Sequence, residues 1–155
     1  MLTIQIPGRE ALALSHLILD YNGTIAQDGK LIPGLESRLQ ALAEALSICV
    51  ITADTHGTAA RNCEGLPLTV LTYPTVEVGA IKAQQAQKLS GGVACIGNGF
   101  NDIQMSDVCD LSICVIGTEG CCGALLSHCD VVVTSILDAL DLLLLPGRLR
   151  ATLRT

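Results

Sequence analysis

Short apolar runs alternate with longer amphipathic stretches along this chain of 155 residues. The apolar runs are rich in Val, Ile and Leu, and several end at a Gly, Thr or Asp. They cover residues 14–19, 48–51, 68–71, 93–96, 111–116 and 131–133. Runs of this length and composition are typical of strands buried on both faces of a parallel sheet. The pattern therefore predicts six such strands, and residues 3–6 alternate in polarity like an edge strand.

The stretches between these runs have helical character. Residues 35–46 carry Leu at a spacing near the helical period, and Pro33 and Gly34 mark the start. Residues 76–89 are rich in Ala, Gln and Lys, and residues 136–145 form a closing helix that Pro146 and Gly147 should end. Strand and helix in turn predict an α/β fold, a Rossmann-like doubly wound parallel sheet in a single domain over residues 1–155.

Composition narrows the classes of function. Hydrophobic residues make up 50% of the chain and charged residues 15%, below the roughly 25% of an average domain. The net charge is −6, with one Phe and no Trp, which argues against a nucleic-acid partner. No apolar run approaches the ~18 residues of a membrane span, and no signal peptide is evident. We expect a cytoplasmic protein without a membrane partner, and the lean surface charge favours a homo-oligomer.

Eight cysteines permit a metal-site hypothesis. No pair has Cys-x-x-Cys spacing, and Cys49, Cys95 and Cys114 lie within apolar runs, where a thiol acts as a small hydrophobe. Cys121, Cys122, His128 and Cys129 could supply four ligands, but adjacent cysteines rarely serve one tetrahedral site. We therefore expect all eight to be thiols that fill the core.

Polar residues follow three of the predicted strands. Asp20-Tyr21-Asn22-Gly23-Thr24 comes directly after the first, and either offers an exposed carboxylate or forms a plain Asp-x-Asn-Gly turn. Thr52 ends the second, where it could hold a phosphoryl oxygen, whereas Asp54 or Thr55 could simply cap the next helix. The carboxyl ends of parallel strands meet at one edge of the sheet, which is where ligands bind.

The third group is Gly97-Asn98-Gly99-Phe100-Asn101-Asp102. Asn101 and Asp102 offer oxygens to a hard cation, and Asp102 stands where a dinucleotide-binding motif would have its third Gly. A carboxylate there would face the pyrophosphate, so that motif is rejected. Lys82 is placed near the same edge if its helix starts close by, whereas Lys88 lies at the far end.

Together these motifs resemble the haloacid dehalogenase (HAD) superfamily of phosphohydrolases. The order is Asp20-x-Asn22-Gly23-Thr24, Thr52, Lys82 and Gly97-Asn98-Gly99-x-Asn101-Asp102. The chain looks most like the phosphorylation domain of P-type ATPases, whose middle motif Thr-Gly-Asp corresponds to Thr52-Ala53-Asp54, and like small soluble P-type ATPase-like proteins. The resemblance implies a Mg²⁺-dependent HAD-type phosphatase that acts on a small phosphorylated substrate or a phosphoprotein.

The resemblance also implies residue roles. Asp20 would be the nucleophile that becomes an aspartyl-phosphate, with Asn22, Thr52 and Lys82 as the other catalytic positions. Mg²⁺ would be held by Asp20, the backbone carbonyl of Asn22, Asn98 and Asp102. The phosphoryl group would be bound by Gly23, Thr52, Ala53 and Lys82, with Thr24 and Asn101 in support.

Two departures from the family pattern shape this expectation. Asn22 replaces an Asp that serves as general acid and base, a role worth roughly 10² to 10⁴ in rate. Asn98 replaces an Asp of the metal site, which removes a negative charge. Both changes favour slow turnover or activated phosphates, and the alternative is a catalytically weak phosphate- and Mg²⁺-binding regulatory protein. A phospho-receiver domain fits less well, because the 97–102 loop has no role there.

The length leaves no room for a large cap domain over the site. Residues 25–34 allow only a small flap, and the segment between Thr52 and Lys82 allows one helix and one strand. We therefore expect an open site unless another subunit covers it.

Overall fold

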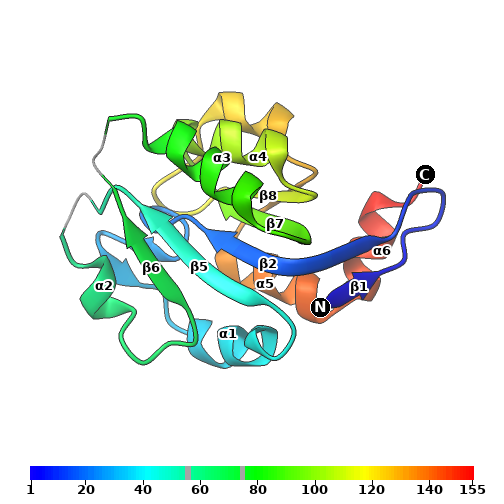
Figure 1. Cartoon of the computed structure of the whole chain (residues 1–155), viewed down its shortest axis with the longest axis horizontal. Coiled ribbons are helices and arrows are strands. Elements are labelled where there is room, and N and C mark those ends of the chain that lie inside the picture. Colours follow the sequence, from blue (N-terminus) through cyan, green and yellow to red (C-terminus); the bar gives the residue numbers. More distant parts are fainter. Residues whose placement is uncertain (55–56, 74–75) are drawn as a thin grey trace.

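The computed structural model describes residues 1–54, 57–73 and 76–155, and its centre is a seven-stranded sheet (Figure 1). Six strands run parallel in the spatial order β6 (Thr69–Thr72), β5 (Ser47–Thr52), β2 (Leu12–Leu19), β7 (Gly92–Gly97), β8 (Leu111–Val115) and β9 (Val131–Val133). The short β1 (Leu2–Ile4) pairs antiparallel with the start of β2. If the six parallel strands are numbered along the chain, their order across the sheet is 3-2-1-4-5-6. The predicted doubly wound α/β sheet is therefore confirmed.

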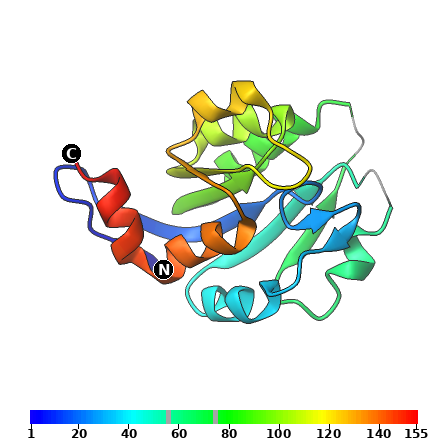
Figure 2. The ribbon, with the colours of Figure 1, turned by 180° about the vertical axis from the view of Figure 1, so that it is seen from behind.

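Helices cover both faces of the sheet, which explains the near-continuous apolar runs (Figures 1 and 2). The helices α1 (Leu35–Ala43) and α5 (Ile136–Leu144) lie on one face, over the larger hydrophobic core. The helices α3 (Val78–Lys88) and α4 (Ile103–Val108) lie on the other, over a smaller core that includes Ile18 and Met105. β2 lies in the middle of the sheet because it pairs with β5 on one side and β7 on the other, and its last three residues are buried.

The C-terminal segment holds a helix that the sequence did not predict. Pro146 and Gly147 end α5, as expected, but they also begin α6 (Pro146–Leu153), which the sequence analysis did not predict. Pro is favoured in the first turn of a helix because its missing N–H would have no partner there. Leu149 of α6 is fully buried, so the segment packs back onto the core instead of trailing away.

The remaining elements are short. The segment between Thr52 and Lys82 holds α2 (Ala59–Asn62) and β6, as its length predicts, and the two 3₁₀ helices are η1 (Phe100–Asp102) and η2 (Gly123–His128). Among the described residues, no helix has both the length and the apolar character needed to cross a membrane.

The predicted flap is a hairpin of two short strands, β3 (Ala26–Gln27) and β4 (Lys30–Leu31). Tyr21 anchors the hairpin, because the Tyr21 hydroxyl donates a hydrogen bond to the carbonyl of Gly29 at 3.1 Å. The amide of Asn62 donates to the same carbonyl at 2.7 Å. The flap is therefore attached to α2 and to the loop after β2 rather than free.

The strand order fixes the place of a ligand site. β2 and β7 are neighbours, but the chain leaves β2 toward β5 on one side and reaches β7 only after β6. Such a topological switch point opens a crevice beyond the carboxyl ends of the two strands. Both chain termini lie at the opposite end of the molecule (Figure 1).

Candidate active site

A buried lysine between two carboxylates forms the centre of this crevice. Lys82 Nζ lies 2.6 Å from Asp20 Oδ1 and 2.6 Å from Asp102 Oδ1. Lys82 and Asp102 are completely buried, and Asp20 is 6% exposed. The structure thus brings together three residues from β2, α3 and η1 that the sequence analysis placed at one edge.

A close approach of two backbones places Lys82. At Gly79, one turn before Lys82 on α3, an added Cβ would lie 3.0 Å from the carbonyl oxygen of Asn101. The helix can therefore lie directly against η1, and Lys82 reaches the carboxylates from its first turns. Its third contact is Asn101 Oδ1 at 3.4 Å, so the three ammonium hydrogens all have acceptors nearby. Lys88 is exposed at the far end of the same helix, as expected.

Burial and charge set the ionisation of this group. Burial, and then the neighbouring Asp102, raise the pKa of Asp20 to about 6, while Lys82 acts against both. The two carboxylates raise the pKa of Lys82 despite its burial, so the lysine stays charged. With Asp20 ionised, the three residues carry a net charge of −1, which favours a further cation.

Asp102 is fixed by the turn that precedes it. Its Oδ2 accepts the backbone N–H groups of Asn98 at 3.0 Å and Gly99 at 2.9 Å. The side chain occupies the space that a Cβ at Gly97 would fill, so Gly97 must be glycine for Asp102 to fold back in this way. Gly-Asn-Gly here serves a carboxylate rather than a phosphate.

Thr24 connects Asp20 to Asn98. Its hydroxyl lies 3.2 Å from Asp20 Oδ2 and 3.1 Å from Asn98 Oδ1. The Asn98 amide also donates to the carbonyl of Gly120 at 3.1 Å. Gly23 has a φ of 77°, and a Cβ there would collide with the Asn98 side chain. The predicted supporting residue Thr24 therefore holds two candidate functional side chains in place, and Gly23 makes room for one of them.

Asn22 carries the one unsatisfied atom of the site. Among the described residues, its Oδ1 is the buried side-chain oxygen or nitrogen left without a hydrogen-bond partner. It lines the same cavity as Asp20 and Asn98. A buried acceptor without a donor is costly unless a ligand, water or ion satisfies it. The donor set of carboxylates, amide oxygens and backbone carbonyls is the kind that Mg²⁺ prefers, so the residues fit a magnesium ion.

A cavity of about 360 Å³ opens above these groups. It is lined by Asp20, Asn22, Thr52, Ala53, Asn98, Gly99, Phe100 and Asn101. Thr52 Oγ1 accepts the backbone N–H of Asp54 at 2.9 Å, which leaves its proton for a ligand. Asp54 Oδ1 accepts the N–H groups of Thr58 and Ala59 at the start of α2. The N-cap of α2 is Thr58, however, so the alternative prediction of Asp54 as the N-cap is wrong, while Thr55 lies outside the described residues.

Phe100 and Tyr21 were given no role by the sequence analysis. Phe100, the only Phe of the chain, is 73% exposed on the rim of this cavity. Tyr21 is the variable position of the first motif, yet it is fully buried and holds the flap. Nothing in the local pattern distinguishes a flap anchor from a core aromatic, because the partner carbonyl lies eight residues away in a turn.

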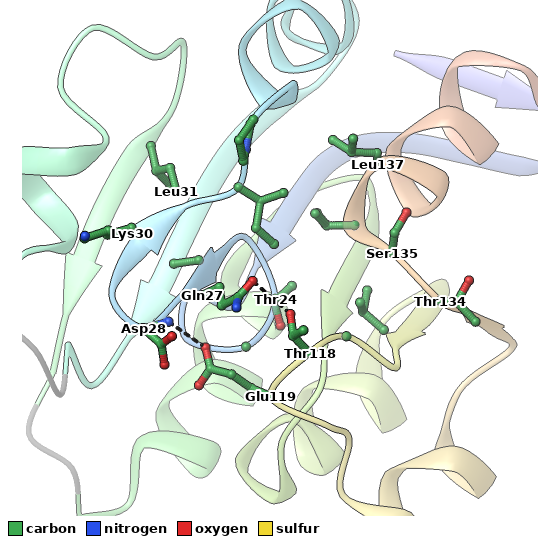
Figure 3. Close-up of a pocket in the computed structure, with 17 residues that line it drawn as sticks. Thr24, Gln27, Asp28, Lys30, Leu31, Thr118, Glu119, Thr134, Ser135 and Leu137 are labelled. Atoms are coloured by element: carbon green, nitrogen blue, oxygen red, sulfur yellow. Dashed lines mark hydrogen bonds between the residues drawn. The ribbon is translucent and has the colours of Figure 1, made fainter.

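A second, larger cavity of about 580 Å³ lies between the flap, the loop after β8 and the start of α5 (Figure 3). Two hydrogen bonds join flap and loop across it, from Thr118 Oγ1 to Gln27 Oε1 at 2.9 Å and from the Asp28 N–H to Glu119 Oε2 at 3.1 Å. Of its lining residues only Gly23 and Thr24 belong to the motifs. The sequence analysis gave no role to the residues of this loop that line the cavity, Gly117, Thr118 and Glu119.

Two proteins of Methanocaldococcus jannaschii resemble the chain in sequence. Uncharacterized protein MJ0073 is 50% identical over 62 residues, which are 40% of this chain and 67% of that protein. Uncharacterized protein MJ0072 is 49% identical over 39 residues, which are 25% of this chain and 89% of that protein. No protein-family model matches the chain.

Solved structures share the fold. The 3-deoxy-D-manno-octulosonate 8-phosphate phosphatase of Moraxella catarrhalis, in complex with magnesium, phosphate and the sugar acid, superposes with a TM-score of 0.68. It is 16% identical, with 91% of this chain and 94% of that chain covered. The cobalt-bound Haemophilus influenzae phosphatase for the same class of compound gives 0.69 at 14% identity, covering 92% and 94%.

A third structure carries the superfamily name. The haloacid dehalogenase-like hydrolase SP0104 of Streptococcus pneumoniae gives a TM-score of 0.59 at 13% identity, with 83% of this chain and 97% of that chain covered. The narrower likeness to P-type ATPases stays a prediction. By sequence the chain belongs to one family with the two Methanocaldococcus proteins, and its fold is that of the haloacid dehalogenase hydrolases.

Proposed function

We propose that the protein is a Mg²⁺-dependent phosphohydrolase that acts through a phosphorylated Asp20. The observation that carries this proposal is the placement of Asp20. Its carboxylate lies at the switch point of the sheet, 2.6 Å from a buried lysine, and faces a cavity bordered by Thr52 and Asn98. Fold relatives that bear the name phosphatase support the reaction class.

The chain's own residues can perform the main steps of such a reaction. An Asp20 carboxylate oxygen attacks phosphorus, the bond to the leaving group breaks, and the leaving group departs with the electron pair. Water then hydrolyses the acyl phosphate and restores Asp20. The Thr52 hydroxyl donates to a phosphoryl oxygen, and Lys82 keeps Asp20 ionised near neutral pH. Lys82 binds one oxygen of Asp20 and the Thr24 hydroxyl lies 3.2 Å from the other, so the carboxylate is held in one orientation.

Magnesium would be held by Asp20, the Asn22 backbone carbonyl, Asn98 and Asp102. A divalent cation there supplies positive charge against the phosphoryl oxygens and the carboxylates. Of these residues, Asp102 would be the least available as a metal ligand, because its two oxygens already accept hydrogen bonds from two backbone N–H groups and from Lys82. Asn98 contributes no charge. We therefore propose that magnesium binds more weakly here than in a site with an additional carboxylate.

The leaving group must tolerate the absence of a general acid. Asn22 stands where a carboxyl could protonate the departing oxygen, and an amide has no acidic proton to give. The carboxylate released from an acyl phosphate and the phenolate released from an aryl phosphate are stable anions that depart without such help, so we propose acyl and aryl phosphates as the preferred substrates. A small phosphorylated compound fits the cavity of about 360 Å³, and a phosphoprotein is the alternative substrate, because the site has only a small flap.

A substrate screen tests the proposal. Purified protein is assayed with acetyl phosphate, p-nitrophenyl phosphate and several sugar phosphates, with and without Mg²⁺. Asp20→Asn should abolish release of phosphate, whereas Asp107→Asn, which changes a half-exposed carboxylate paired with His128, should leave it unchanged. Equal activity of wild type and Asp20→Asn would remove the assignment.

A regulatory protein that binds phosphate and Mg²⁺ is the second candidate. The observations that favour it are the two asparagines and the fully engaged oxygens of Asp102. Beryllium fluoride, which mimics a phosphoryl group on Asp, distinguishes the two candidates. Binding of this mimic without turnover on any phosphate would favour the regulatory role.

A further inference from the structure

Two cysteine sulfurs lie in direct contact beside the candidate active site. Cys114 Sγ on β8 and Cys121 Sγ in the following loop are 2.8 Å apart. A disulfide bond is about 2.05 Å long, so the two sulfurs need to move by less than an ångström to bond. All eight cysteines of the chain are free thiols in the structure, but this pair stands apart from cysteines that merely fill the core.

The surroundings allow such a movement. Cys114 is fully buried near the end of β8, whereas Cys121 is half-buried in a loop that contains Gly117 and Gly120 and ends where η2 begins at Gly123. An N–H to carbonyl bond from Gly120 to Gly117, 3.0 Å long, closes the turn between the two cysteines. The strand is rigid and the loop can adapt, so Cys121 is the partner that moves.

Other cysteines nearby are engaged elsewhere. Cys129 Sγ lies 3.6 Å from the hydroxyl of Ser106, and Cys95 Sγ is within 4.0 Å of the same hydroxyl. Cys122 follows Cys121 directly, but its backbone N–H is bound to the carbonyl of Asn98 at 2.8 Å. The geometry thus singles out Cys114 as the partner of Cys121.

We propose that Cys114 and Cys121 form a reversible disulfide under oxidation by a peroxide. The half-buried Cys121 thiolate attacks the peroxide, which gives a sulfenic acid and releases water or an alcohol. Cys114 then displaces the hydroxyl group of the sulfenic acid as a second water. Two thiols and one hydrogen peroxide thus yield one disulfide and two waters, and a dithiol reductant reverses the change.

The disulfide would fasten the loop that joins the flap to the site. In the loop of residues 116–122, the carbonyl of Gly120 accepts a hydrogen bond from the Asn98 amide. Thr118 and Glu119 of the same loop are hydrogen-bonded to the flap (Figure 3). β8 also pairs with β7 such that Cys114 lies opposite Gly97, immediately before Asn98. Oxidation would therefore restrict a segment that contacts both the flap and the Asn98 side chain. This inference stands independently of the proposed catalysis.

Peptide mapping tests the proposal on the full-length protein. Cleavage before Asp and after Glu yields the peptide 110–119, which contains Cys114 alone, and the peptide 120–129, which contains three cysteines. After brief peroxide treatment we expect these two peptides to be joined, the intact mass to fall by about 2 Da, and dithiothreitol to reverse both changes. Two of the eight thiols should disappear.

Matched variants identify the pair. Cys121→Ser should keep its seven remaining thiols under the same treatment, while the adjacent Cys122→Ser should still lose two. Cys114→Ala, which keeps a small apolar side chain in the strand, should leave Cys121 as a sulfenic acid that dimedone labels. A link that persists in Cys121→Ser, or unlinked peptides in the wild type, would overturn the proposal.

Hydrogen exchange measures the fastening of the loop. In the oxidised wild type, amides of residues 116–122 should exchange several-fold more slowly than in the reduced form, and Cys121→Ser should show no such difference. Equal exchange in both forms of the wild type would contradict the claim that the bond restrains this segment.

Discussion

Asp20 should destabilise the metal-free protein at neutral pH, and Asp20→Asn should relieve that cost. The carboxyl is almost completely buried beside Asp102, and its pKa of about 6 lies roughly two units above the ordinary value of 3.8. A carboxyl whose pKa is raised by folding binds its proton more tightly in the folded state. It therefore favours folding at low pH, and this contribution is lost as the pH rises through 6.

The size of the effect follows from the pKa shift. Each pKa unit corresponds to about 1.4 kcal/mol, so ionised Asp20 lowers the free energy of unfolding by about 3 kcal/mol above pH 7. Asn keeps the shape of the side chain and an oxygen for Lys82, but it carries no charge. For a domain of this size, 3 kcal/mol corresponds to about 6–12 °C in melting temperature. Lys82 does not change the sign, because it stays protonated throughout this range.

Urea unfolding in EDTA from pH 4 to 8 measures this difference. The gain of Asp20→Asn over wild type should be small at pH 4, rise between pH 4 and 6, and level off above pH 7. Saturating Mg²⁺ should stabilise the wild type more than the variant, which narrows the gap. Asp28→Asn, at an exposed flap position, is the control for the exchange of a carboxylate for an amide outside the buried site. A pH-independent difference, or a variant that is less stable at pH 8, would refute the electrostatic reasoning.

Three further substitutions probe the remaining parts of the site. Asn22→Asp adds the missing carboxyl and should speed hydrolysis of alkyl phosphates at least about tenfold, with a smaller gain for p-nitrophenyl phosphate, as initial rates with both substrates would show. Lys82→Met leaves two buried carboxylates without a cation, so urea unfolding should show a loss of about 3–5 kcal/mol at pH 7, much of it regained at pH 5. Gly23→Ala should cost more stability than Gly65→Ala by at least about 1 kcal/mol in thermal unfolding. Both glycines have positive φ, but only at Gly23 would the added Cβ meet Asn98.

The sequence was sufficient for the sheet and for the position of the main site residues. Buried parallel strands appear in the sequence as short apolar runs. A residue that follows such a run lies at the edge of the sheet where the strands have their carboxyl ends. Asp20, Thr52 and Asp102 could therefore be placed without side-chain detail. The helix end at Pro146 was predicted correctly, but the helix that begins there was missed, because a proline fits both the end of one helix and the first turn of the next.

The contacts that set ionisation could not be predicted in the same way. That Lys82 lies between two carboxylates depends on the close approach of α3 and η1 at Gly79, which joins segments more than twenty residues apart. The flap anchor at Tyr21 and the bonds from Thr118 and Glu119 to the flap are likewise tertiary. Each depends on where a loop carbonyl or carboxylate lies in space, which no local period encodes.

Asparagine in place of aspartate at position 98 does more than remove a negative charge, because its amide group also makes a hydrogen bond to the loop after β8. The carbonyl of Gly120 needs a donor, and the Asn98 amide supplies it at 3.1 Å while its oxygen receives the Thr24 hydroxyl. An ionised Asp has no proton to donate and would repel that carbonyl. The amide of Asn98 carries no charge, but it holds the loop through Gly120. Thr118 and Glu119 of this loop are in turn hydrogen-bonded to the flap. Asn98 therefore connects the flap to the proposed cation site, so if a cation binds at Asn98, its binding and the position of the flap should depend on each other.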